Sequence, residues 1–172
     1  MNDIEIKQLI ITDLDQLQRI SRQTFSETFN SCNTEANMRK YLDEDFSAEK
    51  LSTELRDKNA LFFFAMHSNR VIGYLKINFG PAQTESQEEE GIEVERLYVL
   101  SEFYGKGVGQ LLLDKSKEIA LQKSADYLWL GVWEHNARAI SFYKKNGFIE
   151  FGKHIFMLGD DEQIDKLMKL KL

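Results

Sequence analysis

The sequence predicts a mixed α/β fold built on a central sheet. Short apolar runs with strand-like alternation are interspersed with segments whose apolar residues recur at helical spacing. Two adjacent apolar runs are separated by the turn-forming residues 68–70, which is typical of a β-hairpin. The second half reads as strand, helix, strand, helix, strand and strand. This order excludes a helical bundle and a β-sandwich.

The first half predicts one strand, three helical regions and the hairpin. Ile4 and Ile6 alternate with polar residues and suit a strand over 3–11, and Thr12 followed by Asp15 resembles a capping box that starts a helix. The segments expected after this helix are helical regions at about 34–46 and 47–57, strands at 61–66 and 71–79, and a polar loop at 80–91.

The second half predicts four more strands and two helices. The strands are expected at 92–100, 127–133, 148–158 and about 164–170, and the helices at 108–123 and 136–146. The first of these helices is amphipathic, and the residues expected on its apolar side are Leu111, Leu112, Ile119 and Ala120.

Length and composition narrow the function. The 172 residues suit one domain over 1–172, and 42% apolar residues can bury a sizeable core. No run approaches the ~20 apolar residues of a membrane span, and the first residues lack a signal pattern, so we expect a cytoplasmic protein without a membrane partner. The net charge of −6 argues against nucleic acid. A lone Cys32 and three histidines without ligand spacing predict no disulfide and no metal.

The most informative stretch follows the strand at 92–100. Residues 104–109, Tyr-Gly-Lys-Gly-Val-Gly, turn directly into the amphipathic helix. Glycines permit positive φ, and the first amides of a helix are unpaired and carry the positive end of its dipole. Such a turn suits a phosphate or pyrophosphate, although a plain tight turn is the alternative. The P-loop string is absent from the sequence. The dinucleotide fingerprint Gly-x-Gly-x-x-Gly is not present either, because Leu112 stands where its last glycine would be.

The spacing instead resembles the pyrophosphate loop of the GCN5-related N-acetyltransferases (GNAT), Gln/Arg-x-x-Gly-x-Gly/Ala. Gly107 and Gly109 hold the glycine positions, and Tyr104 stands where Gln or Arg is usual. The segment LGVWEHNARAISFYKKNGF at 130–148 is similar to the strand-then-helix block of the same family. The closest resemblance within the family is to PaiA-type spermidine/spermine N-acetyltransferases, carried also by FFF…GYLKIN, IEVERLYV and FMLGDDEQID.

This resemblance implies the GNAT fold, with a mostly antiparallel twisted sheet of six to seven strands flanked by helices. It also implies acetyl-CoA as cofactor and direct acetyl transfer to an amine, with a polyamine such as spermidine as the expected acceptor. Dimers are common in the family, so a homodimer is one expectation. The cofactor-binding residues that it implies are Leu97, Tyr98, Val99, Tyr104, Gly105, Lys106, Gly107, Val108, Gly109, Asn136, Tyr143 and Lys145.

Three residues are catalytic candidates. Tyr143 is the candidate acid toward the departing sulfur, and the alternative is that it is only a packed aromatic side chain. For Asn136, one of the expected cofactor-binding residues, the alternative is that it is only a helix N-cap. An aliphatic amine with a pKa of about 10 needs a proton acceptor. Glu93 and Glu95 lie on the strand at 92–100 with the parity of Leu97 and Val99, and the choice between them stays open. The alternative for each is a residue paired with Arg96 or a neighbouring lysine.

The acceptor is open as well. Glu85 and residues 88–90 precede the central strand and would raise the local concentration of a polycation, although an acidic run is more often only solvated surface. Other acceptors would be a protein N-terminus, a lysine or another small amine. A non-catalytic acyl-CoA-sensing module is the alternative from a different class.

Overall fold

A seven-stranded sheet forms the centre of the computed structural model, which describes residues 3–85 and 91–172. The strand order is β1-β2-β3-β4-β5-β7-β6, and every neighbouring pair is antiparallel except β4 and β5. The predicted mixed sheet is therefore confirmed. The strands are β1 (Ile4–Gln8), β2 (Ala60–His67), β3 (Arg70–Asn78), β4 (Gly91–Val99), β5 (Tyr127–Trp133), β6 (Ile149–Leu158) and β7 (Asp161–Lys171).

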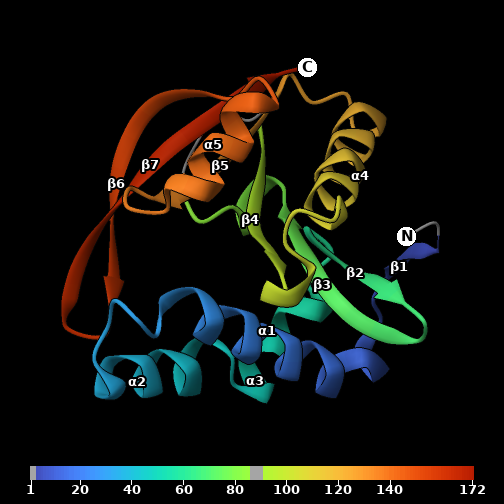
Figure 1. Ribbon diagram of the computed structural model, residues 1–172. Helices are drawn as coiled ribbons and strands as arrows, with labels where there is room; N and C mark the ends of the chain where they lie inside the picture. The colour runs from blue at the N-terminus through green and yellow to red at the C-terminus, as the bar shows by residue number, and fades with distance from the viewer. Residues whose placement is uncertain (1–2, 86–90) are drawn as a thin grey trace.

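Helices cover both faces of the sheet (Figure 1). Helices α1 (Leu14–Phe29), α2 (Glu35–Asp45) and α3 (Ala48–Arg56) lie together below the sheet in this view, and α4 (Val108–Gln122) packs on the opposite face. Helix α5 (Ala137–Lys145) lies beside the start of α4, where the Gln110 and Asn146 side chains are hydrogen-bonded at 2.8 Å and 3.1 Å. No helix in the described ranges is long and apolar enough to cross a membrane.

The helix starts follow local side-chain chemistry. Thr34 caps α2 by accepting a hydrogen bond from the Asn37 amide at 3.2 Å, and Ser47 caps α3 in the same way through Lys50. The expected capping box of Thr12 is wrong. The carboxylate of Asp13 instead accepts from the Ile10 amide at 3.0 Å, because a short 3-10 turn precedes α1.

Two further predictions differ in detail from the structure. On the apolar side of α4, Leu112, Ile119 and Ala120 are buried as expected, but Leu111 is 41% exposed. Strand β7 begins at Asp161, three residues before the expected start at 164, because a tight turn containing Gly159 at φ +68° connects it directly to β6.

The middle of the sheet opens beside β4. In the described part of the chain its pairing with β5 covers Gly91 to Glu93, and after Glu93 the two strands separate. On its other side, β4 pairs with β3 up to Val99, and the Leu100 amide donates to the Ile72 carbonyl at 2.9 Å. Because amide direction alternates along an antiparallel strand, the amides of residues 97 and 99 point away from β3 into the opening.

A β-bulge interrupts β4 just before this opening. Arg96 lies opposite Lys76 and Val94 opposite Ile77, so Glu95 is an extra residue without a partner on β3. The bulge ends the simple alternation expected from the sequence. Consequently the side chains of Glu93 and Glu95 are not on the side of Leu97 and Val99.

Candidate active site

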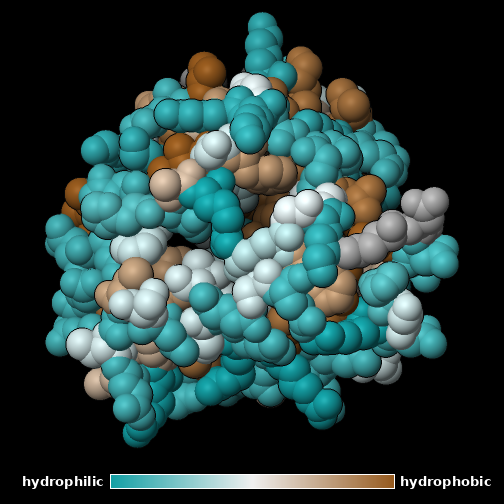
Figure 2. All heavy atoms as spheres, in the orientation of Figure 1, coloured by the Kyte–Doolittle hydropathy of each residue, from teal (hydrophilic) through white to brown (hydrophobic). Residues whose placement is uncertain are grey.

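Two hollows meet where β4 and β5 separate. The first, with a volume of about 560 Å³, is lined by the loop before α4, by β4 and by α5; we call it the glycine-loop pocket. The second, with a volume of about 320 Å³, lies between α1, α2, β4 and the strands β5, β7 and β6; we call it the carboxylate cavity. Figure 2 shows a hollow near the middle of this face, bordered by residues of mixed hydropathy. The residues that line both hollows are Leu97, Tyr98, Asn136, Ala139 and Tyr143.

The glycine-loop pocket presents unpaired backbone amides. Gly105 and Gly107 have φ values of +71° and +83°, a backbone region that glycine adopts without strain. Gly107 is the N-cap of α4, and the first helical bond runs from the Leu111 amide to the Gly107 carbonyl at 3.1 Å. The amides of residues 108–110 therefore have no partner within the helix, and the helix dipole adds positive potential there.

Most of the expected cofactor-binding residues line this pocket, and Lys106 is the exception. Its ammonium group lies 5.0 Å from the ring centre of Phe103. Arg138, which the sequence did not single out, lines the pocket and lies 3.5 Å from the ring centre of Tyr104. Arg138 lies two residues after Asn136, in the first turn of α5. Its positive charge was the one sequence signal that could have indicated a role in binding phosphate.

Tyr143 and Asn136 stand at the junction of the two hollows. Tyr143 packs its ring against Phe142 and Phe148, with ring centres 5.2 Å and 5.5 Å apart, and burial raises the pKa of its hydroxyl. Within the described part of the chain this hydroxyl forms no hydrogen bond. Asn136 caps α5 by accepting from the Ala139 amide at 3.1 Å. Tyr143 is thus a packed aromatic and Asn136 is a helix N-cap, which were the structural alternatives, and both residues also line the two hollows.

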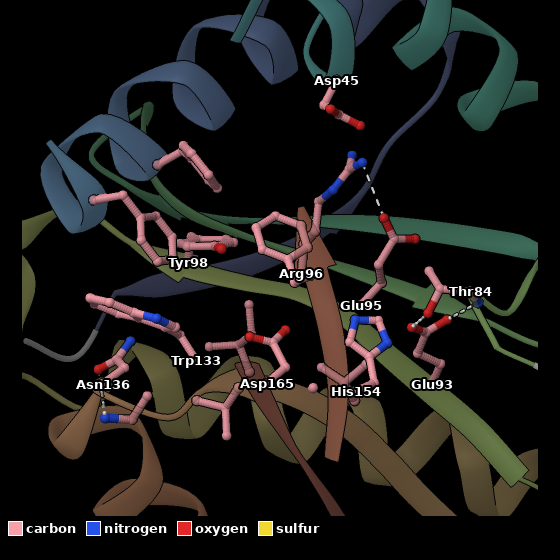
Figure 3. A pocket seen from close by; sticks show the side chains of 18 of the residues that line it. Asp45, Thr84, Glu93, Glu95, Arg96, Tyr98, Trp133, Asn136, His154 and Asp165 are labelled. Atoms are coloured by element: carbon pink, nitrogen blue, oxygen red, sulfur yellow. Dashed lines mark hydrogen bonds and ion pairs between the residues drawn. The ribbon is translucent and has the colours of Figure 1, made fainter. Parts of the chain in front are cut away.

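The carboxylate cavity takes its name from four acidic side chains in its wall. They come from three separate elements, and Figure 3 shows them around one space. Among the described residues, these carboxylates are Asp45, Glu93, Glu95 and Asp165, and the fixed cations in the same wall are Lys50 and Arg96.

Glu93 is buried and held by neutral donors. It accepts hydrogen bonds from the Thr84 amide at 2.8 Å, the Thr84 hydroxyl at 2.5 Å and the Asn78 side-chain amide at 3.1 Å. Burial raises the pKa of Glu93, and these hydrogen bonds offset only part of that shift. Its carboxylate therefore binds protons more readily than an exposed glutamate.

Glu95 belongs to a buried ionic cluster. Its carboxylate lies 2.5 Å from the Lys76 ammonium and 3.1 Å from the Arg96 guanidinium, and Glu54 on α3 contacts the same two cations at 3.0 Å and 2.8 Å. Burial alone would raise the pKa of Glu95, but Arg96 and Lys76 outweigh it and lower the pKa to about 2. The ion-pair alternative therefore describes Glu95 well.

The sequence did not assign two side chains, Asp165 and His154, to the wall of the cavity. Asp165 on β7 lies directly opposite His154 on β6, and His154 contacts the carboxylate of Glu85. Burial raises the pKa of Asp165 to about 6, with His154 lowering it and Glu85 raising it. Of the acidic run expected before β4, Glu85 thus reaches the cavity wall region, while residues 88–90 lie outside the described residues.

Comparison with known proteins agrees with this geometry. The model of the acetyltransferase (GNAT) family matches residues 14–148. The chain belongs to the GNAT acetyltransferase family. An uncharacterized N-acetyltransferase in the pepI 3' region of Lactobacillus delbrueckii subsp. lactis is 38% identical over all of this chain and 99% of its own length.

Two relatives from Thermoplasma acidophilum bear on the subgroup. A spermidine N(1)-acetyltransferase is 29% identical over 84% of this GNAT chain and 88% of its own. The crystal structure of the PaiA N-acetyltransferase in complex with coenzyme A has a TM-score of 0.81 and 26% identity, and it covers 99% of both chains. The resemblance to PaiA-type proteins, read from the sequence, is confirmed.

Proposed function

We propose that this GNAT protein transfers the acetyl group of acetyl-CoA to a primary amine of a polyamine such as spermidine, by direct attack in a ternary complex. The observation that carries the proposal is the junction of two hollows of different chemistry at Tyr143. One hollow offers amides for phosphate groups, and the other offers carboxylates for ammonium groups.

The glycine-loop pocket fits coenzyme A. The unpaired amides of residues 108–110 are donors for a diphosphate, and Arg138 and Lys145 add positive charge in the same pocket. A solved relative with a TM-score of 0.81 holds coenzyme A, which supports the same use here. When bound, acetyl-CoA supplies the acetyl group as a thioester.

Two groups of the chain serve the thioester. The amides of Leu97 and Val99 point into the opening beside β4, where they would donate to the carbonyl oxygen as it gains negative charge. Tyr143 keeps its proton because burial raises its pKa, so its hydroxyl would donate that proton to the departing sulfur.

The amine needs a proton acceptor in the carboxylate cavity. Of the two glutamates expected from the sequence, Glu93 suits this role better than Glu95. The pKa of Glu93 is raised by burial, whereas Arg96 and Lys76 hold that of Glu95 at about 2 despite its burial. A carboxylate with so low a pKa is a weak base.

A polycationic acceptor is supported by charge and by likeness. The four carboxylates in the described wall of the cavity outnumber its two fixed cations. Negative potential focused in a cleft raises the local concentration of a polycation. The spermidine N(1)-acetyltransferase from Thermoplasma acidophilum shows that a relative of similar length acts on spermidine.

A panel of amines tests the proposal. Purified protein is incubated with acetyl-CoA and spermidine, spermine, a monoamine, or a peptide with a free N-terminus and a lysine, and thiol release and product mass are followed. We expect release with spermidine and spermine at the lowest concentrations. Release with the peptide but not with polyamines would move the acceptor to a protein amine. Coenzyme A binding without release by any amine would support the acyl-CoA-sensing alternative.

A further inference from the structure

The carboxylates of the cavity differ in how they are held. Glu93 accepts three hydrogen bonds, Glu95 is paired with two cations, and Asp45 is paired with Lys50. Asp165 differs from all three, because within residues 3–85 and 91–172 its carboxylate forms neither a hydrogen bond nor an ion pair. An incoming ammonium group can therefore approach Asp165 without displacing an existing partner.

The position of Asp165 is set by three strands. It lies in the register opposite Trp133 on β5 and His154 on β6, so its side chain shares a side of the sheet with two other residues of the cavity wall. Its carboxylate leans over Gly131 on β5, where a Cβ atom would lie only 3.2 Å from Oδ2. The missing side chain at residue 131 provides the room that this carboxylate occupies.

We infer that Asp165 binds the ammonium group of the acceptor and takes its proton before the amine attacks. This inference rests on the proposed function and names a residue for the proton transfer that the sequence had assigned to Glu93 or Glu95. Asp165 on β7 and Tyr143 on α5 line the same cavity, so an amine bound in it has both a proton acceptor and a proton donor in the surrounding wall.

The proton and electron balance follows. Asp165 takes one proton from the ammonium group and passes it to solvent, which leaves a lone pair on nitrogen. The nitrogen forms a bond to the acetyl carbonyl carbon, and the carbon–sulfur bond breaks. Sulfur takes the proton of Tyr143, and the resulting tyrosinate recovers a proton from the amide nitrogen. The products are the acetylated amine and the free thiol.

The surroundings of Asp165 suit a base that works near neutral pH. Burial raises its pKa to about 6, so the carboxylate is ionised at neutral pH and still binds a proton more readily than an exposed aspartate. The titratable and charged groups that face it from neighbouring elements and across the cavity are His154, Glu85, Glu93, Glu95, Arg96, Asp45, Lys50, Tyr41, Tyr98 and Tyr143.

The test compares Asp165→Asn with Glu93→Gln and with Glu162→Gln, an exposed residue of the same strand that loses the same charge. With spermidine and saturating acetyl-CoA, the kcat/KM of the wild type should rise through about pH 6 and then level off, because kcat/KM reports the ionisation of the protein before spermidine binds. For Asp165→Asn we expect a loss of about 100-fold at about pH 7. Its kcat/KM should then keep rising toward the amine pKa of about 10, because only the neutral amine reacts. Glu162→Gln should follow the wild type.

The outcomes separate this inference from the proposed function. If Asp165→Asn keeps the wild-type profile while Glu93→Gln loses the limb near pH 6, Glu93 is the base and the inference is wrong. Calorimetry gives a reading that does not need turnover. Spermidine should bind the protein–coenzyme A complex at least about tenfold more weakly in Asp165→Asn. If the wild type binds spermidine but has no transferase activity, and Asp165→Asn binds spermidine more weakly, the ammonium site is supported and the transferase proposal is refuted. Equal binding by both proteins, or no binding by the wild type, overturns the inference.

A second variant tests the same site through its neighbour. In His154→Gln the group that lowers the pKa of Asp165 is gone, while Glu85, which raises it, remains. The limb of the kcat/KM profile should therefore move to higher pH. A merely structural role of Asp165 would leave the limb in place, and an unmoved limb would contradict the inference.

Discussion

The carboxylate of Asp165 fills the space that a side chain on Gly131 would occupy. A Cβ atom at residue 131 would lie 3.2 Å from Oδ2 of Asp165, so an alanine there must push the carboxylate aside. The two residues belong to β7 and β5, which are neighbouring strands of the sheet. This relationship makes Gly131 a means of moving Asp165 without changing its chemistry.

Gly131→Ala should lower kcat/KM for spermidine at least about tenfold, because a misplaced base transfers protons poorly. The free energy of unfolding should change by less than about 1 kcal/mol, since alanine suits a strand better than glycine. Gly152→Ala on β6 is the matched control, because its Cβ would be 3.5 Å from Leu167, an ordinary contact. Unaltered activity in Gly131→Ala would show that the position of Asp165 is unimportant.

Tyr143→Phe should retain the fold and lose the reaction. The ring contacts with Phe142 and Phe148 remain, and only the hydroxyl disappears. We expect kcat to fall about 100-fold with little change in KM, as for loss of a proton donor. Tyr127→Phe, at the start of β5 and outside both hollows, serves as the control for removal of a tyrosine hydroxyl. A wild-type kcat in Tyr143→Phe would exclude Tyr143 as the acid.

Glu95→Gln should destabilise the protein. Removing this charge leaves Lys76 and Arg96 with Glu54 alone, and breaking a buried ion pair costs about 3 kcal/mol. Glu35→Gln removes the exposed pair with Arg39, and we expect a change below about 0.5 kcal/mol. Urea unfolding measures both.

The effect of Glu95 should depend on pH. Burial opposes ionisation, but Arg96 and Lys76 lower the pKa of Glu95 in the folded protein to about 2, below the ordinary glutamate value of 4.5. Its contribution is therefore fully present above about pH 4.5 and is lost as pH falls toward 2. The stability difference between wild type and Glu95→Gln should shrink over this range. A difference that is constant between these pH values would contradict the ion-pair account.

Gly107→Ala should weaken both stability and cofactor binding. At φ +83° an alanine is strained by about 1–2 kcal/mol, although the space around the position is open. Because Gly107 sets the direction of the first amides of α4, coenzyme A affinity should fall about fivefold, or about 1 kcal/mol. Urea unfolding and calorimetry measure the two effects, with Gly152→Ala as control. Full coenzyme A affinity in a destabilised Gly107→Ala would separate the loop from the cofactor.

The sequence predicted most of the fold because the signals are local. The strand at 127–133 has the predicted bounds, and the caps at Thr34 and Ser47 and the glycine loop before α4 depend on residues a few positions apart. The amino-acid pattern could not show the bulge at Glu95. A bulge depends on pairing with β3, and alternation along one strand cannot reveal it.

The acceptor side of the site was harder to predict. Asp165 and His154 reach the cavity through the β6–β7 hairpin, and no spacing in the sequence relates them to β4, which lies far earlier in the chain. The roles of Tyr143, Glu93 and the loop residues stay predictions until the variants are measured. So do the single domain over 1–172, a cytoplasmic location and a homodimer.

The separation of β4 from β5 has a thermodynamic consequence. Among the described residues, three residue pairs join the two strands, so the sheet has a seam through its centre, with β1–β4 on one side and β5–β7 on the other. A molecule that bridges the seam would contact β4 with one part and α5 with another. Such a ligand binds only when the two parts of the sheet are assembled, so it stabilises the folded state to a degree that depends on ligand concentration. The protein should therefore unfold at a higher temperature with the ligand bound than without it.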